Sequence, residues 1–445
     1  MQISKARFPE FGQHVSIISR GAHYGDGRWL ELKVGNRQAL QELIGQCVEN
    51  QVGVVIGKRR ELPLSIDKER LIAFIDISEI NRVVEHIPED QVITVETGMR
   101  LKDLDLYLKE HNQFFPAAFG REDATVLDVI ASGDGGVLEH GFGGPRDLVL
   151  GLEVLTANGS AIKCGGKVVK NVTGYDLTKL FVGSRNSLGI PCLAHLRLFA
   201  RPAESAALLL TTRKMPELLE QANQLLSLGL PVSCMEILDA RLLSRLIHLH
   251  DPDDKCGLMN SAIFGGEVYY AFILQVAGPQ GAVDETLPQL KALRFGQALV
   301  RMPLSFEEHI LPAVSDVGAI GHLNPIDISV ATRDLLVLVR NWWQRNGHLP
   351  VQIRLGTNRM RLFSDSPAAT RKVLDSLSKK SAELSEPPVV SCSNSDHDYQ
   401  VVRFDAAAAE RDQMQNRSPA AIARQLKERF DPSGCMNPLA AMFQV

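Results

Sequence analysis

The sequence lacks several features that would place a protein in a specialised class. Its seven cysteines lie far apart and none occurs in a CxxC pair, the spacing common in zinc and iron–sulfur sites. No stretch reaches the ~18 consecutive apolar residues of a membrane span, and no apolar run of the secretory kind follows the first basic residues. We therefore expect free, mostly buried thiols, no metal site, no transmembrane segment and a cytoplasmic location.

The sequence also lacks a strong charge imbalance. Lys and Arg number 48 against 52 Asp and Glu, which gives a net charge of -4, and the one basic block that stands out is residues 58–60. A nucleic-acid partner requires a basic surface, so none is expected. Hydrophobic residues make up 45% of the 445-residue chain, which is enough to build large cores in roughly two to three domains.

The first half of the chain alternates strand and helix patterns. Short apolar runs at residues 29–34, 52–57, 71–78 and 91–98 predict strands. Helical spacing of Leu40, Leu43, Ile44 and Cys47, after Asn36 as N-cap, predicts a helix, and residues 100–112 predict a second one. Two apolar runs flank Asn158-Gly159, which predicts a hairpin. This order is typical of an α/β or an α+β domain.

The second half repeats a helix–strand rhythm after a predicted boundary near Ala203. Residues 216–230 and 240–250 predict helices, and residues 232–238 and 268–278 predict strands, as in a sheet covered by helices on one face. A further helix is predicted at 334–347 and later strands at 351–356, 388–392 and 399–404. Residues 405–417 read as a linker. The final helix begins after Ser418, with Pro419 in its first turn.

Glycines cluster in the first half, although the usual nucleotide motifs are missing. There is no GxxxxGK[ST], and no GxGxxG joins the first strand and helix. The glycines gather at Gly57, residues 133–136, residues 141–144 and residues 165–189. Such loops let a backbone approach a ligand and offer N–H donors, as a dinucleotide would need. The same spacing is equally consistent with ordinary tight turns.

Two separated stretches carry a resemblance to a known family. "RDLVLG" (146–151), "KNVTGYDL" (170–177) and "GSRNSLG" (183–189), with "LKERFDPSGCMNP" (426–438), resemble the FAD-binding domain of the vanillyl-alcohol-oxidase type and, more narrowly, the glycolate oxidase FAD-binding subunit. The resemblance implies an α+β fold. A PCMH-type FAD-binding domain would cover residues 1–203 and a second α+β (ferredoxin-like) cap domain residues 204–417. A C-terminal segment at 418–445 would return to the FAD domain.

The resemblance also implies a function. The chain would be the FAD-binding subunit of a glycolate-type 2-hydroxy-acid dehydrogenase or oxidase complex. Its partners would be a catalytic flavoprotein subunit and an iron–sulfur subunit, through which it could lie peripheral to a membrane. The implied FAD contacts are the following residues: Gly57, Lys58, Arg59, Thr125, Ser132, Gly133, Gly136, Asn171, Gly174, Tyr175, Gly189 and Ile190.

No catalytic residue or metal ligand can be assigned. The HxGDGNxH-like motif of the partner subunit is missing from this sequence. His248 and His250 lie two apart on a predicted helix and face in different directions, so we expect exposed or capping side chains. The acidic stretch Asp251, Asp253 and Asp254 is expected to be solvated and not to bind a metal.

The sequence departs from the family at three places. Residues 58–60 stand where the family has a glycine-rich "RGGGT" loop. Leu127-Asp128 replace the paired glycines of "ATxGGxxA", and Pro191 removes a backbone donor. These changes support an alternative, a cofactor-poor, non-catalytic scaffold subunit that retains the flavoprotein fold. A third reading, an oxidase that acts alone on another alcohol or sugar acid, lacks a candidate catalytic histidine or tyrosine.

Overall fold

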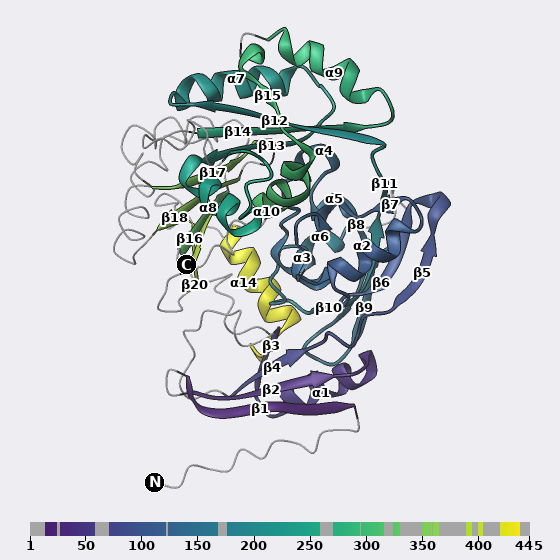
Figure 1. The fold of residues 1–445 in the computed structure, drawn as a ribbon. Coiled ribbons are helices and arrows are strands. Elements are labelled where there is room, and N and C mark those ends of the chain that lie inside the picture. The colour runs from purple at the N-terminus through teal and green to yellow at the C-terminus, as the bar shows by residue number, and fades with distance from the viewer. Residues whose placement is uncertain are drawn as a thin grey trace.

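A computed structural model describes most of the chain, and Figure 1 shows an amino-terminal sheet, a central sheet and a large third sheet in succession. The described residues are 14–24, 27–57, 71–121, 123–167, 176–258, 270–293, 295–315, 324–329, 349–355, 357, 359–364, 389–393, 399–403 and 419–436. The predicted helix at 334–347 and linker at 405–417 lie outside these ranges. Within them, no helix is both long and apolar enough to cross a bilayer.

The amino-terminal sheet has four strands and one covering helix. Its order is β1 (Val15–Tyr24), β2 (Gly27–Val34), β4 (Ile72–Asp76) and β3 (Gly53–Ile56), and all but the β1–β2 pair run parallel. Helix α1 (Arg37–Glu49) begins as predicted, because the side chain of Asn36 accepts a hydrogen bond from the Ala39 N–H at 2.9 Å. Its predicted apolar positions are all buried in one core with the sheet.

The central sheet is antiparallel and has five strands. Its order is β5 (Val83–Ile87), β6 (Val92–Glu96), β10 (Ile190–Arg197), β8 (Val149–Leu155) and β9 (Ala161–Gly165). The β8–β9 hairpin turns at the predicted Asn158-Gly159 pair, where Gly159 has a φ of 75°. Helices α2 (Leu101–Lys109), α3 (Val126–Ser132) and α6 (Thr178–Phe181) contribute to the core of this sheet. Shorter elements are β7 (Gln113–Phe114), β11 (Phe199–Ala200), α4 (Glu139–Phe142) and α5 (Pro145–Leu148).

The third sheet, which we call the cap sheet, has nine described strands in antiparallel pairs. Their order is β15 (Val300–Arg301), β12 (Glu204–Thr212), β14 (Tyr270–Gly278), β13 (Val232–Asp239), β17 (Val351–Arg354), β18 (Arg359–Ser364), β16 (Asn324–Ser329), β19 (Val389–Ser393) and β20 (Tyr399–Arg403). Helices α7 (Met215–Ser227) and α9 (Ala282–Lys291) cover one face. Helices α8 (Ala240–His250) and α10 (Leu311–Ser315) pack on the other face, toward the central sheet and its helices (Figure 1).

The structure confirms the α+β class and adds elements that the sequence patterns did not predict. Strands β1, β5 and β12 are new, and α3 is a helix at the place where the family has the paired glycines of "ATxGGxxA". Strand β12 follows the predicted boundary near Ala203 directly. Its apolar run Ala206–Leu210 is buried on both faces, so it does not show the polar alternation that marks a half-exposed strand.

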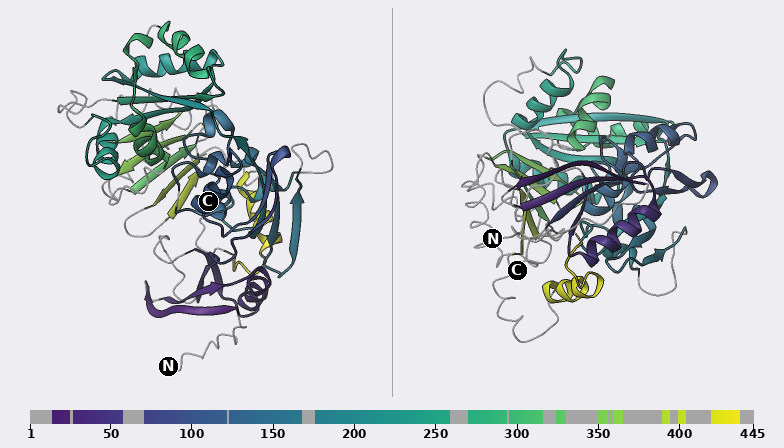
Figure 2. Two further views of the ribbon diagram at one scale, coloured as in Figure 1. Left: turned by 45° about the vertical axis from the view of Figure 1, so that its right-hand side comes forward. Right: turned by 90° about the horizontal axis from the view of Figure 1, so that it is seen from below.

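The carboxyl-terminal helix α14 (Pro419–Phe430) lies against the central and amino-terminal sheets (yellow in Figures 1 and 2). Lys427 Nζ donates hydrogen bonds to Ser187 O at 2.6 Å, Met436 O at 2.6 Å and Asp431 Oδ2 at 2.7 Å. Beyond the helix, Cys435 O accepts a bond from Val54 N at 2.7 Å. The tail thus extends the amino-terminal sheet beside β3.

Replacing Lys427 with methionine should loosen this attachment. Methionine keeps most of the side-chain volume but removes the Lys427 donor from two backbone carbonyls and the cation from the buried Asp431 carboxylate, so the free energy of unfolding should fall by about 1–3 kcal/mol. Urea denaturation measures this loss. Glu428→Ala, at an exposed position one residue along, is the control. Equal stability of Lys427→Met and the wild type would show that the lysine does not hold the tail.

Candidate functional site

The first candidate feature is the amino-terminal turn of α3, which includes Thr125, one of the FAD contacts that the family resemblance implies. The Asp128 carboxylate accepts bonds from Thr125 N and Thr125 Oγ1, both at 2.7 Å, and Asp128 N donates to Thr125 Oγ1 at 3.2 Å. This reciprocal arrangement is a capping box. The helix begins here because the capping box satisfies the backbone donors of Thr125 and Asp128.

The remaining amides of this turn are also used within the protein. Val126 N donates to Met99 O at 2.9 Å and Leu127 N to Thr97 O at 2.8 Å. The side chain of Leu127 is only 2% exposed and packs in the core beneath the amino-terminal sheet. A diphosphate at this turn would meet no open N–H group and would face the negative charge of Asp128.

The second feature is the turn Gly183–Ser187, which lies against the carboxyl end of α3. Gly183 N donates to Ile130 O at 2.8 Å and Arg185 N to Ala131 O at 3.0 Å. Gly183, Arg185 and Asn186 have φ values of 83°, 53° and 61°, and non-glycine residues rarely adopt positive values without support from their surroundings. The turn is therefore a strained segment that tertiary contacts hold in place.

This turn carries buried polar atoms that suit a polar ligand. Ser184 Oγ and Asn186 Oδ1 are buried and, within the described part of the chain, have no hydrogen-bond partner. Buried polar groups are normally paired. The Gly183–Ser187 turn thus offers two unpaired oxygens to the FAD that the sequence resemblance implies, whereas the first turn of α3 offers it no open N–H group.

A third feature was not anticipated from the sequence: a buried cluster of charges where the loop after α3 meets the cap sheet. The Asp134 carboxylate pairs with Arg354 Nη1, and it lies 3.4 Å from Arg359 Nη1 and 3.8 Å from Arg361 Nη2. Gly136 N also donates to Asp134 Oδ1 at 3.0 Å. All three arginines come from β17 and β18, so the cap sheet supplies the cations and the central domain supplies the anion.

The electrostatics of the cluster follow from burial and neighbouring charge. Burial opposes ionisation of Asp134, yet the guanidinium groups of Arg354, Arg359, Arg121 and Arg361 hold its pKa well below the usual value. Burial raises the pKa of Glu236 to about 8, although Arg354 Nε lies 3.4 Å from Glu236 Oε1 and opposes the shift. Asp134 is therefore firmly ionised at neutral pH, whereas Glu236 is largely protonated.

The structure places the predicted FAD contacts at separate points. Gly57 directly follows β3 and donates its N–H to Ile75 O at 3.0 Å. Thr125, Ser132 and Gly133 belong to α3 and its ends, and Gly136 belongs to the charge cluster. Gly189 packs against β8, where an added Cβ would lie 2.7 Å from Val154, and Ile190 is a core residue at the start of β10. Lys58, Arg59, Asn171, Gly174 and Tyr175 lie outside the described residues, so this set of contacts stays a prediction.

The arginines of the charge cluster, which was not predicted, lie in two stretches with a recognisable sequence pattern. Residues 351–355 and 359–362 alternate apolar and polar side chains, which places Gln352, Arg354, Arg359 and Arg361 on one face of the sheet. The apolar partners face α7 and α9 in the opposite core. The pattern could have predicted a charged sheet face, but nothing in the sequence connects that face to Asp134, more than 200 residues away.

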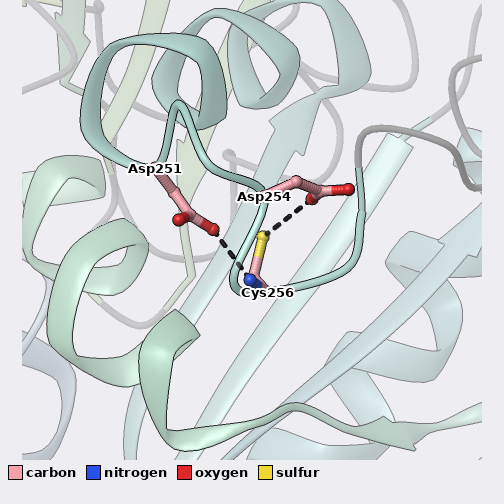
Figure 3. Close-up of side chains that lie close together, drawn as sticks. All are labelled: Asp251, Asp254 and Cys256. Carbon is pink, nitrogen blue, oxygen red and sulfur yellow. Dashed lines mark hydrogen bonds between the residues drawn. The ribbon is translucent and has the colours of Figure 1, made fainter.

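A group of three possible metal ligands, Asp251, Asp254 and Cys256, follows α8 (Figure 3). Asp251 accepts bonds from Lys255 N at 3.0 Å and Cys256 N at 2.8 Å, and Asp254 accepts one from Leu258 N at 2.7 Å. Burial raises the pKa of the Cys256 thiol to about 12, so it stays protonated and is a poor ligand. These side chains shape the loop after α8.

The protonation of Glu236 should be visible in the pH dependence of stability. Its pKa is raised from the usual 4.5 to about 8. The folded protein therefore keeps a proton that the unfolded chain loses, and stability falls by up to ~1.4 kcal/mol per pH unit between about pH 5 and 8. Glu236→Gln cannot ionise, so its unfolding free energy should decline less over this range.

Urea denaturation at several pH values between 5.5 and 8 measures the difference. Glu89→Gln, which makes the same change at an exposed position, serves as the control and should follow the wild type. Parallel pH profiles of the wild type and Glu236→Gln would show that Glu236 ionises normally in the folded protein.

Comparison with protein families and curated relatives gives consistent matches. Residues 31–165 match the FAD binding domain family. Glycolate oxidase subunit GlcD of Bacillus subtilis is 28% identical over 255 residues, which are 56% of this chain and 52% of that protein. Glycolate oxidase subunit GlcE of Escherichia coli is 31% identical over 177 residues, 38% of this chain and 49% of that protein. A probable mitochondrial D-lactate dehydrogenase of Danio rerio is 33% identical over 166 residues, 37% of this chain and 33% of that protein.

The matched segments span about a third to a half of the length of these curated relatives. Solved structures are similar to nearly the whole chain. An alkyldihydroxyacetonephosphate synthase superposes with a TM-score of 0.62 at 13% identity and covers 92% of this chain and 76% of its own. The 4-ethylphenol oxidase of Gulosibacter chungangensis gives 0.63 at 14% identity, with coverage of 94% and 90%. Residues 31–165 therefore match the FAD binding domain family, the chain has the fold of these two solved structures, and glycolate oxidase subunits are among the proteins that it resembles.

Proposed function

We propose that this chain is the FAD-linked subunit of a 2-hydroxy-acid oxidoreductase complex, and that it passes electrons to a partner subunit. The observation that carries the proposal is the family match over residues 31–165 together with the relatives named for glycolate and D-lactate. Glycolate and D-lactate share a hydroxyl group next to a carboxylate, so the common substrate class is a 2-hydroxy acid. When bound, FAD supplies the two-electron acceptor that oxidation of such an acid requires.

The described residues have binding and positioning roles in this proposal. The strained Gly183–Ser187 turn offers Ser184 Oγ and Asn186 Oδ1 to the cofactor. Lys427 fixes the same turn from α14 through Ser187 O. A catalytic flavoprotein subunit and an iron–sulfur subunit are the proposed partners, and the 2-hydroxy acid would be oxidised within that assembly.

One observation favours a second candidate function, a cofactor-poor scaffold subunit that retains the flavoprotein fold. The first turn of α3 is closed by its own capping box, and Leu127 fills the core beside it. A helix start that is already paired with a carboxylate gives a diphosphate little to bind. In this case the chain would stabilise or position the partner subunits without taking part in electron transfer.

Flavin content separates the two candidates. The chain is purified alone and together with the subunits that co-purify with it from its native cell, and released flavin is quantified by absorption and chromatography. The first proposal expects stoichiometric FAD on this chain, bleached by anaerobic addition of glycolate or D-lactate to the complex. Absence of FAD from this chain in both preparations would contradict that proposal and leave the scaffold function.

The capping carboxylate of α3 gives a finer test. Asp128→Asn keeps the side-chain size and removes the charge that a diphosphate at this turn would face. If charge repulsion weakens FAD binding there, the variant should bind FAD about tenfold more tightly, equivalent to ~1.4 kcal/mol. Fluorescence titration measures the affinity, and Asp103→Asn on the exposed side of α2 is the charge-matched control.

An unchanged affinity in Asp128→Asn would show that the diphosphate does not lie at the first turn of α3. A capping residue is also altered, so thermal unfolding of both variants is measured alongside. A loss of stability without a gain in affinity would assign Asp128 a structural role alone.

A further inference from the structure

The charge cluster between the loop after α3 and the cap sheet consists of one aspartate and three arginines, side chains that are seldom buried without a partner of opposite charge. Arg354 is 5% exposed and Asp134 16% exposed. Three guanidinium groups converge on one carboxylate, and all three lie on the same face of β17 and β18. A planar guanidinium is shaped to bind carboxylate oxygens, so this face of the cap sheet has the chemistry of a carboxylate-binding site.

Each arginine is also fixed by a second partner, so the three groups are positioned independently of Asp134. Arg354 Nη2 donates to Ser315 O at 3.0 Å, and Arg354 Nε lies 3.4 Å from Glu236. Arg359 Nη2 donates to Gly133 O, and Arg361 pairs with Asp327. The arginines would therefore stay close together if the Asp134 carboxylate were absent.

The carboxylate is held just as firmly on its own side. Asp134 sits in a loop of glycines, between Gly133 with φ 64° and Gly136 with φ 76°. Gly136 N donates to Asp134 Oδ1, and Arg121 Nη1 donates to the Asp134 carbonyl at 2.7 Å. The loop thus presents one carboxylate to the cap sheet at a fixed point.

We propose that Arg354, Arg359 and Arg361 form a binding site for a small carboxylate, and that the chain fills this site itself with the side chain of Asp134. We call the contact the interdomain latch. It fastens the loop after α3 to the cap sheet, and it keeps external carboxylates out of the arginine site. The proposal concerns only this contact between the loop after α3 and the cap sheet, and it holds whether or not the chain binds FAD.

Chemical rescue tests the latch on the full-length chain. Asp134→Ala removes the carboxylate and leaves room for an external one, so the variant should unfold several degrees below the wild type. Added formate should raise its unfolding temperature in a saturable way and should leave the wild type unchanged against sodium chloride of equal ionic strength. Formamide, which has a similar size and no charge, should not rescue it.

Two further variants serve as controls. Asp134→Asn fills the space without the charge, so it should be destabilised and not rescued by formate. Asp327→Ala removes a half-exposed carboxylate that pairs with one of the same arginines, and it should show a smaller loss and no rescue. The proposal is overturned if Asp134→Ala keeps wild-type stability, or if formate stabilises the wild type and all three variants alike.

If Asp134→Ala does not fold, the unfolding temperatures of Asp134→Asn and Asp327→Asn are compared instead. A larger drop in unfolding temperature for Asp134→Asn supports a latch at Asp134. An equal or smaller drop overturns it, because Asp134 would then contribute no more than a peripheral partner of Arg361.

Discussion

The arrangement of the two larger sheets depends on one requirement, that the buried Asp134 carboxylate be neutralised. A carboxylate placed in the interior without a partner carries a large desolvation cost. Among the described residues, β17 and β18 of the cap sheet bring three arginines to it, and Arg121 adds a fourth cation from outside the cap sheet. The loop after α3 and the cap sheet are therefore complementary, and the central domain is fixed to the cap through this charge pairing as well as through the apolar contacts around Phe114, Phe119 and Leu138.

Electrostatic pairing within the chain also shapes the first turn of α3, where it works against the binding of a ligand. There a carboxylate from the chain, Asp128, satisfies the helix start and occupies a place where an anionic ligand could otherwise bind. At both points an aspartate of the chain itself, Asp134 or Asp128, takes the position that an anionic ligand could occupy. The Gly183–Ser187 turn differs, because its buried Ser184 and Asn186 oxygens have no described partner and so remain suited to a polar ligand.

Local patterns predicted local structure well. Helix α1 begins at Asn36 and buries Leu40, Leu43, Ile44 and Cys47 as its spacing predicted, because capping and periodicity act within a few residues. The β8–β9 turn at Gly159 is equally local. Strand β12 was missed since its residues are buried on both faces, and α3 was missed because this stretch was compared only with the paired glycines of the family, although Thr125 and Asp128 form a capping box.

By itself the sequence determined several of the longer helices, the β8–β9 hairpin and the resemblance to the glycolate oxidase FAD-binding subunit, which implied the α+β class, since each rests on residues close together in the chain. Only the tertiary structure decided that Asp134 meets Arg354, Arg359 and Arg361, that Leu127 fills a core, and that Lys427 binds Ser187. These contacts join residues from about 30 to more than 200 positions apart. Which distant charges and side chains meet depends on how whole sheets pack, and no local pattern records that.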